Sequence, residues 1–269
     1  MNTKQHTETA TNYDVNAMSV NELLAAINTE DANVHKAIAL CLPTITTVTE
    51  QCIATLTNKG RVVYIGAGTS GRLGVLDAAE CMPTFGIDNN TIIGIIAGGF
   101  KALNSAVENA EDDQQQAIND LNDLNFTAND ILIGLSASGT TPYVLAALQH
   151  ARALGAKTVG ITNNLNSPML TTASITIECV VGPEFIAGST RMKAGTSQKL
   201  ILNMISTTCM IKLGRTKGNL MTHLMPMNIK LKKRAVSIIC NELAISEAEA
   251  TELLARYATI DAVLTNYQP

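Results

Sequence analysis

Four hydroxyl side chains follow one of the apolar runs in this chain and stand close enough together to bind an anion. They fall within six residues, at Ser136, Ser138, Thr140 and Thr141, and Pro142 follows them where it suits the first turn of a helix. Hydroxyl groups beside the free N–H groups of a helix N-terminus form a neutral cradle for phosphate. An ordinary capped turn is the alternative, although a cap needs only one side-chain oxygen. The segment therefore predicts a phosphate-binding loop.

A second loop of this kind is rich in glycine. Residues 66–72 read Gly-Ala-Gly-Thr-Ser-Gly-Arg and follow another apolar run. Glycine lets the backbone approach a ligand, and the N-terminus of the next helix attracts an anion. Gly68, Thr69 and Ser70 are therefore candidate ligand contacts.

The glycine spacing also fits a different ligand. Gly66, Gly68 and Gly71 match the dinucleotide-binding fingerprint, which requires an acidic residue at the end of the second strand to bind a ribose. The second apolar run ends instead on two glycines, Gly98 and Gly99. A dinucleotide is therefore disfavoured.

Both loops need a scaffold that brings them together, and the spacing of apolar runs predicts a parallel α/β sheet. Five runs are typical of buried strands: 61–66, 92–97, 131–136, 158–162 and 175–180. Helical segments are expected at 71–81, 103–121, 142–154 and 195–213. Strands that alternate with helices form a parallel sheet with right-handed crossovers, and ligands bind beyond the carboxyl ends of its strands. The two loops should therefore lie side by side.

Helices are also expected before and after the sheet. Segments 21–28 and 34–59 have helical spacing, and Ser246 with Glu249 predicts a capping box at the start of a helix in the tail. The chain is accordingly divided into an N-terminal arm with helices (1–59), an α/β domain (60–222) and a small helical C-terminal region (223–269).

Composition excludes several classes of protein. The chain has 269 residues and a net charge of −4, without a basic stripe for nucleic acid. Its apolar stretches are strand length, so no membrane span or secretory signal is expected. The six cysteines are scattered and the four histidines do not cluster with acids, which predicts free thiols, no metal and a reducing, cytoplasmic location.

Longer motifs in the chain resemble a known family. Residues 66–81, 182–196 and 198–204 are similar to the signatures of the N-acetylmuramic acid 6-phosphate etherases, and the resemblance runs from about Thr7 to Asn219. It implies a three-layer sugar-isomerase (SIS) domain that works without a cofactor on a small phosphosugar. It also implies a homodimer whose active site lies near the subunit interface, with the apolar segment Leu200–Leu213 available for that contact. Family members often carry a bulkier residue where this chain has Thr140.

The activity implied by the resemblance is elimination of D-lactate from the sugar, followed by hydration. It requires a base at C2 and an acid on the departing lactyl oxygen, and carboxyl groups in different environments suit both roles. Glu80 matches the family position for the acid and Glu111 the position for the base. Glu80 has apolar neighbours, whereas Glu111 lies in an acidic run that could also be an ordinary solvated helix face.

The third motif adds further candidates by resemblance. Glu184 could hold sugar hydroxyl groups, and Ser189, Arg191 and Lys193 could contact the phosphate or the lactyl carboxylate. A surface loop and a positive face near a subunit interface are the alternatives. Two rival functions share the same loops: a phosphosugar isomerase, which needs no acid at C3, and a non-catalytic phosphosugar sensor like the regulatory protein of animal glucokinase, which would tolerate loss of Glu80.

Overall fold

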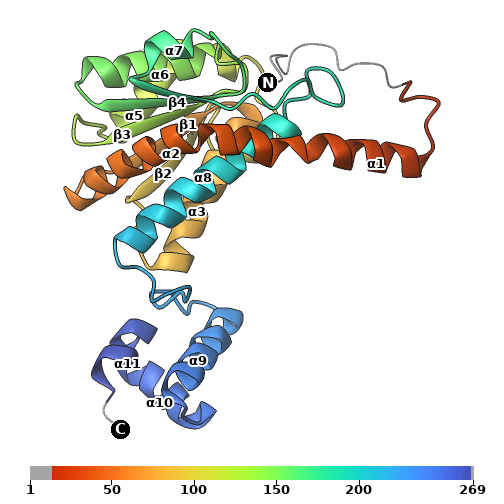
Figure 1. Ribbon diagram of the computed structural model, residues 1–269. Coiled ribbons are helices and arrows are strands. Elements are labelled where there is room, and N and C mark those ends of the chain that lie inside the picture. The colour runs from red at the N-terminus through yellow and green to blue at the C-terminus, as the bar shows by residue number, and fades with distance from the viewer. Residues whose placement is uncertain (1–13, 268–269) are drawn as a thin grey trace.

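The structure is a computed structural model that describes residues 14–267, so the start of the predicted N-terminal arm lies outside it. Its centre is a parallel sheet of five strands in the order β2-β1-β3-β4-β5 (Figure 1). The strands are β1 (Val62–Gly66), β2 (Ile92–Ile96), β3 (Ile131–Leu135), β4 (Lys157–Thr162) and β5 (Ile175–Glu178). The predicted parallel α/β sheet is confirmed, and each strand lies within two residues of its expected bounds.

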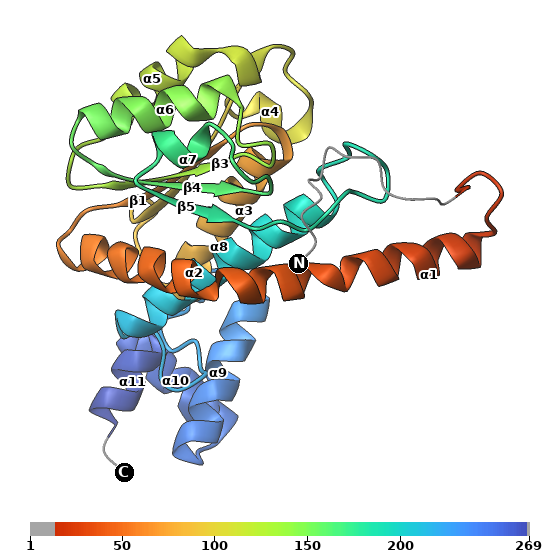
Figure 2. The ribbon, with the colours of Figure 1, turned by 45° about the horizontal axis from the view of Figure 1, so that its top comes forward.

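Helices cover both faces of the sheet and form the outer layers. One face packs on α2 (Asn33–Thr57), α3 (Gly68–Phe85) and α8 (Lys193–Lys212). The other packs on α5 (Gln114–Asp123), α6 (Pro142–Ala153) and α7 (Met169–Thr172), as Figure 2 shows. Successive strand residues point to opposite faces, so Tyr64 joins the first core and Ile65 the second.

The helix expected over 103–121 is wrong as a single element. The chain forms α4 (Lys101–Asn104), a one-turn 3₁₀ helix η1 (Ala110–Asp112) and then α5. Ser105 is extended and Asn109 has a left-handed backbone with φ of 60°, which a continuous helix cannot contain. The Asp113 side chain then accepts a hydrogen bond from Gln116 N at 2.9 Å and starts a new helix. Glu111 therefore lies on a short turn between helices.

The two helices expected over 21–28 and 34–59 are confirmed. α1 (Val20–Asp31) and α2 follow each other almost without a break, and the stretch Val20–Thr57 is long and apolar enough to span a membrane by length and composition. The apolar side of α2, including Ile38, Ile45 and Val48, is buried against α8 and β5. This helix is therefore a core helix of the α/β domain, whereas α1 has no buried residue and extends away from it (Figure 2).

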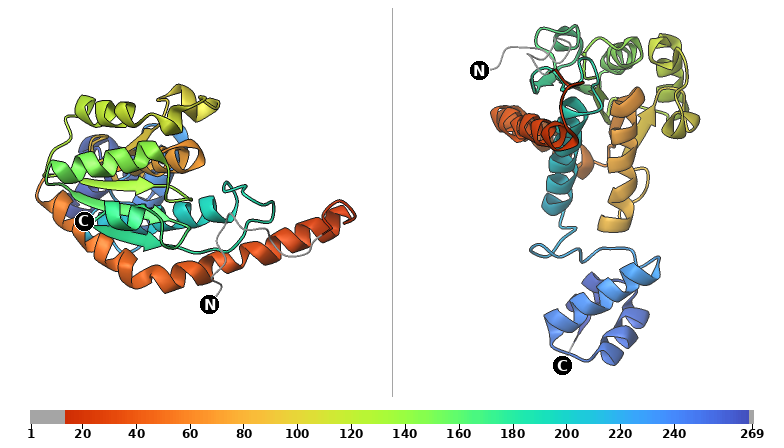
Figure 3. Two further views of the ribbon diagram at one scale, coloured as in Figure 1. Left: turned by 90° about the horizontal axis from the view of Figure 1, so that it is seen from above. Right: turned by 90° about the vertical axis from the view of Figure 1, so that its right-hand side faces the viewer.

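A small helical unit follows the α/β domain. It contains α9 (Ile229–Leu243), α10 (Glu247–Tyr257) and α11 (Ile260–Asn266), which enclose a core of their own (Figure 3). Ser246 caps α10 through Glu249 N at 3.2 Å, but the return bond of the predicted capping box is not formed. Both bonds of a capping box occur instead at Ser19 and Glu22, where α1 begins. The boundaries 1–59, 60–222 and 223–269 remain predictions.

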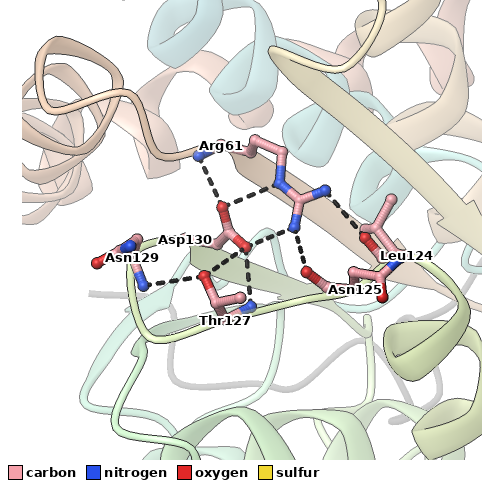
Figure 4. A network of polar contacts seen from close by, with 6 residues as sticks. All are labelled: Arg61, Leu124, Asn125, Thr127, Asn129 and Asp130. Carbon is pink, nitrogen blue, oxygen red and sulfur yellow. Dashed lines mark hydrogen bonds and ion pairs between the residues drawn. The ribbon is translucent and has the colours of Figure 1, made fainter.

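A partly buried ion pair ties the first strand to the third at the amino edge of the sheet. The Arg61 guanidinium donates to both carboxylate oxygens of Asp130, from Nε at 3.0 Å and from Nη2 at 2.7 Å (Figure 4). It also donates to the carbonyl oxygens of Leu124 and Asn125. β1 and β3 are thus aligned at one end, so the loops that leave their other ends have a rigid base.

Candidate active site

Three helices begin at the carboxyl edge of the sheet and direct their N-termini toward one region. α3 begins at Gly68, α6 at Pro142 and α8 at Lys193. The first turns of α3 and α8 are in close contact, because a Cβ atom at Gly195 would lie only 3.3 Å from Thr69 Cγ2. β1 and β3 are neighbours in the sheet, so the loops that follow them are adjacent too. No side chain caps the N-termini of α3 and α6, so their N–H groups favour an anion there, whereas Glu184 occupies the N–H groups of Lys193 and Ala194 at the start of α8.

The glycine loop after β1 is shaped by its own packing. A Cβ atom at Gly66 would lie 2.7 Å from Gly71 N, and one at Gly71 would lie 2.6 Å from Gly66 O. The tight turn therefore requires both glycines whatever ligand is bound. The match to the dinucleotide fingerprint has this local explanation. Gly68, Thr69 and Ser70, the predicted ligand contacts of this loop, lie at the start of α3.

The hydroxyl loop after β3 is held together by its own hydrogen bonds. Ser136 Oγ lies 2.7 Å from Thr141 Oγ1 and 3.3 Å from Ser138 Oγ, and it accepts a bond from Gly139 N at 3.0 Å. Thr140 Oγ1 donates to Ser138 Oγ at 2.8 Å. The structure thus gathers all four predicted hydroxyls into one cluster, as a preformed phosphate cradle requires.

The loop after β4 supports this cradle from behind. Gly139 has φ of 70°, and a Cβ atom there would lie 2.2 Å from Ser167 Oγ and 2.7 Å from Thr162 Oγ1. Asn163 N donates to Ala137 O at 3.0 Å. The hydroxyl cluster therefore lies on a packed layer of polar side chains, which limits its movement.

Glu111 lies beside the glycine loop. A pocket of about 240 Å³ is lined by Gly68 and Arg72 on one side and by Glu108 and Glu111 on the other. The side chain of Glu111 is exposed, so it is accessible to a ligand in that pocket. The structure thus brings one predicted catalytic residue to the predicted ligand loop.

Glu80 lies elsewhere in the same chain. It stands 12 residues after Gly68 on α3 (80 − 68), which corresponds to about 18 Å along a helix that rises 1.5 Å per residue. Its side chain is exposed, and Leu76 on the same helix face is 52% exposed. Within one chain the Glu80 side chain is therefore exposed to solvent and lacks the apolar surroundings that the sequence predicts for it.

Two predicted ligand contacts are occupied by internal bonds. Both carboxylate oxygens of Glu184 accept backbone hydrogen bonds at the start of α8, from Lys193 N and Ala194 N at 2.9 Å each. Burial raises the pKa of Glu184, and these bonds and the Lys193 charge oppose that shift. The buried Lys193 ammonium donates to Glu30 at 2.6 Å. Arg191 is exposed and Ser189 half-buried in the loop between them.

Sequence reasoning missed two acidic residues near these elements. Glu30, on α1, is 163 residues from its partner Lys193, so no local spacing could reveal it. Asp77 lies on the buried face of α3 and accepts bonds from Asn203 at 2.6 Å and Ser206 at 3.1 Å, which link α3 to α8. Burial raises its pKa, against the effect of those bonds. The sequence signal for Asp77 is its position as an acidic residue within the otherwise apolar segment 75–79.

Comparison with known proteins first defines the class. The SIS domain model matches residues 102–207, and the model of the glucokinase regulatory protein N-terminal SIS domain matches residues 44–152. The structure of a phosphoheptose isomerase from Neisseria gonorrhoeae has a TM-score of 0.56 at 18% identity, covering 71% of this chain and 98% of that one. The fold is that of an SIS-domain protein.

Curated relatives narrow the class to one family. N-acetylmuramic acid 6-phosphate etherase from Christiangramia forsetii is 48% identical over 259 residues, which cover 96% of this chain and 94% of the relative. The etherase from Actinobacillus succinogenes is 48% identical over 247 residues, covering 92% and 81%. The chain belongs to the N-acetylmuramic acid 6-phosphate etherase family.

Proposed function

We propose that this protein cleaves the D-lactyl ether of N-acetylmuramic acid 6-phosphate, giving N-acetylglucosamine 6-phosphate and D-lactate. The observation that carries the proposal is that Glu111 lines one pocket with Gly68 in a chain of the etherase family. The product and the substrate class place the enzyme in cytoplasmic recycling of cell-wall amino sugars. No cofactor is needed, because the reaction is an elimination followed by addition of water.

The phosphate is held by the hydroxyl cluster and the adjacent helix N-termini. Ser136, Ser138 and Thr141 supply hydroxyl donors, and Thr140 lies exposed at the rim. Backbone N–H groups at the start of α3, including those of Thr69 and Ser70, add donors without a charged side chain. Arg191, exposed in the loop before α8, pairs with the lactyl carboxylate.

Glu111 removes the proton from C2 of the open-chain sugar, whose C1 aldehyde acidifies that position. The electron pair forms the C2–C3 double bond and the C3–O bond breaks. The lactyl oxygen takes a proton from a carboxylic acid, and D-lactate leaves. Water then adds to C3 of the unsaturated aldehyde, and C2 regains a proton.

Glu80 is the acid, supplied by a second copy of the chain. Within one copy it stands about 18 Å along α3 from the ligand loop, which is too far for proton transfer to a bound sugar. A homodimer with two-fold symmetry places each copy's Glu80 at the other's site. The exposed face that carries Leu76 and Glu80 is then covered by the partner, which provides the apolar surroundings that favour a protonated carboxyl group.

Lactate release from the phosphosugar, with the unphosphorylated sugar as control, tests the reaction. Glu80→Gln should block release by about 100-fold or more yet allow solvent exchange at C2, whereas Glu111→Gln should suppress both. An isomerase would convert phosphosugars without releasing lactate. A sensor would bind the phosphosugar tightly without turnover, and either result would exclude the proposal.

Mixing the two variants tests the shared site. In an equal mixture about half the dimers are mixed, and each has one site with both glutamates, so about one quarter of wild-type activity should return. Glu50→Gln, an exposed change on α2, is the control and should keep full activity. If both glutamates act from one copy, the mixture stays inactive.

A further inference from the structure

Charges of opposite sign are separated along this chain to an unusual degree. Residues 102–150 contain seven acids and no lysine or arginine: Glu108, Glu111, Asp112, Asp113, Asp120, Asp123 and Asp130. Residues 185–241 contain ten cations and no acid: Arg191, Lys193, Lys199, Lys212, Arg215, Lys217, Lys230, Lys232, Lys233 and Arg234. The two segments are therefore complementary in charge.

The basic segment ends in an exposed cluster at the start of α9. Four cations fall within five residues, and apolar side chains directly precede them. Ile229 is 77% exposed and Met227 is 66% exposed. Among residues 14–267, the cations in this cluster form no ion pair: Lys230, Lys232, Lys233 and Arg234. We name residues 227–234 the basic end.

The acidic segment borders a hollow along β2, which is an edge strand. The hollow has a volume of about 450 Å³, with Val75 and Leu103 among its apolar lining and Asp120 and Asp123 at its rim. Phe100, also in the lining, is 82% exposed. Asp120 already accepts hydrogen bonds from Tyr143 and Gln116, so Asp123 is the carboxylate available to a partner. We name this hollow the acidic groove.

The two surfaces cannot meet within one copy. Figures 1 and 2 place α9, α10 and α11 at the opposite end of the molecule from α4 and α5. The chain before α9 is fastened to the end of α3, where Met225 N donates to Pro83 O at 3.1 Å. Gly86 lies so close to His223 that a Cβ atom would be 2.3 Å from its carbonyl oxygen. The basic end is therefore tethered within about one turn of Glu80.

We propose that the basic end of one copy docks in the acidic groove of a second copy. Met227 and Ile229 cover Phe100 and the apolar lining, while the lysines pair with Asp123 and Asp112. A two-fold dimer satisfies both surfaces twice, because each copy carries both of them. This inference rests on the proposed function in one respect: docking holds the partner's α3, and with it Glu80, beside Glu111.

Cross-linking of the unmodified protein tests the contact directly. A carbodiimide joins a lysine to a carboxylate that it touches, and a mixture of ¹⁴N and ¹⁵N chains identifies links between copies by mass spectrometry. Mixed-isotope links from residues 230–233 to residues 108–123 are expected. Links from these lysines only within one copy, or only to other acids, overturn the proposal.

Charge reversal measures how much the contact contributes. Lys232→Glu with Lys233→Glu should weaken self-association by about tenfold or more, and addition of Asp112→Lys with Asp123→Lys should recover most of the loss. Arg152→Glu with Lys157→Glu makes the same charge change at exposed positions outside both surfaces and should have little effect. An unchanged dissociation constant, measured by sedimentation without substrate, overturns the proposal.

The experiments can refute the etherase function and the docking of the basic end independently of each other. If wild type releases no lactate but the cross-links form, the etherase function is refuted and the docking stands. If lactate is released and the copies do not cross-link through these segments, the docking is refuted and the function stands.

Discussion

The ion pair between the partly exposed Arg61 and the buried Asp130 should make a large contribution to stability, and Asp130→Asn measures it. Asp130 accepts four short hydrogen bonds, from Arg61 N, Nε and Nη2 and from Thr127 N, at 2.7–3.0 Å. An asparagine turns one acceptor into a donor that faces the guanidinium. Loss of one partner of a buried pair costs about 3–5 kcal/mol. Arg61 is 23% exposed and keeps two carbonyl partners, so about 3 kcal/mol is expected.

The free energy of unfolding lost in Asp130→Asn should appear both as a lower melting temperature and as a change in the pH dependence of stability. A cost of about 3 kcal/mol should lower the Tm by roughly 6–12 °C in a domain of this size. Burial alone would raise the pKa of Asp130, but the hydrogen bonds from Arg61 and Thr127 outweigh it and hold the pKa below its ordinary 3.8. The stabilisation is therefore complete above that ordinary value and is lost as the pH falls through the lower folded-state pKa.

Urea unfolding followed by circular dichroism tests both statements. The difference between wild type and Asp130→Asn should be constant near neutral pH and should shrink once the pH falls below 3.8. Glu50→Gln removes an exposed carboxylate on α2 and should change the free energy of unfolding by less than about 0.5 kcal/mol. The reasoning is refuted if Asp130→Asn costs less than about 1 kcal/mol, or if its cost persists unchanged in acid.

Three further predictions concern the ligand loops and their support. Gly139→Ala should cost at least about 2 kcal/mol and weaken phosphosugar binding in calorimetry, because its Cβ atom would lie 2.2 Å from a hydroxyl behind the loop. Gly188→Ala has a similar φ of 75° but open space, so a smaller cost of about 1 kcal/mol and a smaller loss of binding are expected; equal losses would contradict the packing explanation. Glu30→Gln should cost about 3 kcal/mol in thermal unfolding, since it leaves the buried Lys193 ammonium without a charged partner, and Lys193→Met in the same chain should restore most of it. Ser136→Ala should raise the KM for the phosphosugar by about tenfold with its fold intact, because a hydroxyl donor is lost from the cradle; an unchanged KM would remove Ser136 from the phosphate site.

The strands and the two ligand loops could be predicted because their signals are local. A parallel strand buried on both faces is a short continuous apolar run, and all five runs stand out between polar segments. Residues 66–72 and 136–141 directly follow two of those runs, so the carboxyl-edge rule located them without any knowledge of side-chain contacts.

The surroundings of Glu111 could not be predicted in the same way. Apolar residues between 103 and 121 have helical spacing, and nothing in that spacing shows the break at Asn109. The break depends on a left-handed backbone and on a new cap at Asp113, which compete with helix propagation. The pairing of Lys193 with Glu30 could not be predicted from the sequence for a different reason, because it joins residues far apart in the chain.

The two halves of the motif over residues 66–81 lie too far apart to act on one ligand within one copy, and this separation favours a shared active site. Its first half forms a ligand loop and its second half carries Glu80, yet the two halves are joined by a helix. A helix rises about 5.4 Å per turn, so each further turn of α3 moves a residue away from the loop that starts it. A carboxylate more than three turns along cannot serve the ligand bound at the helix N-terminus. If both halves act in one reaction, the second half must act on a ligand held by another copy. Glu80 and the basic end fastened near Pro83 lie at the same end of α3, where a second copy has to approach for this to occur.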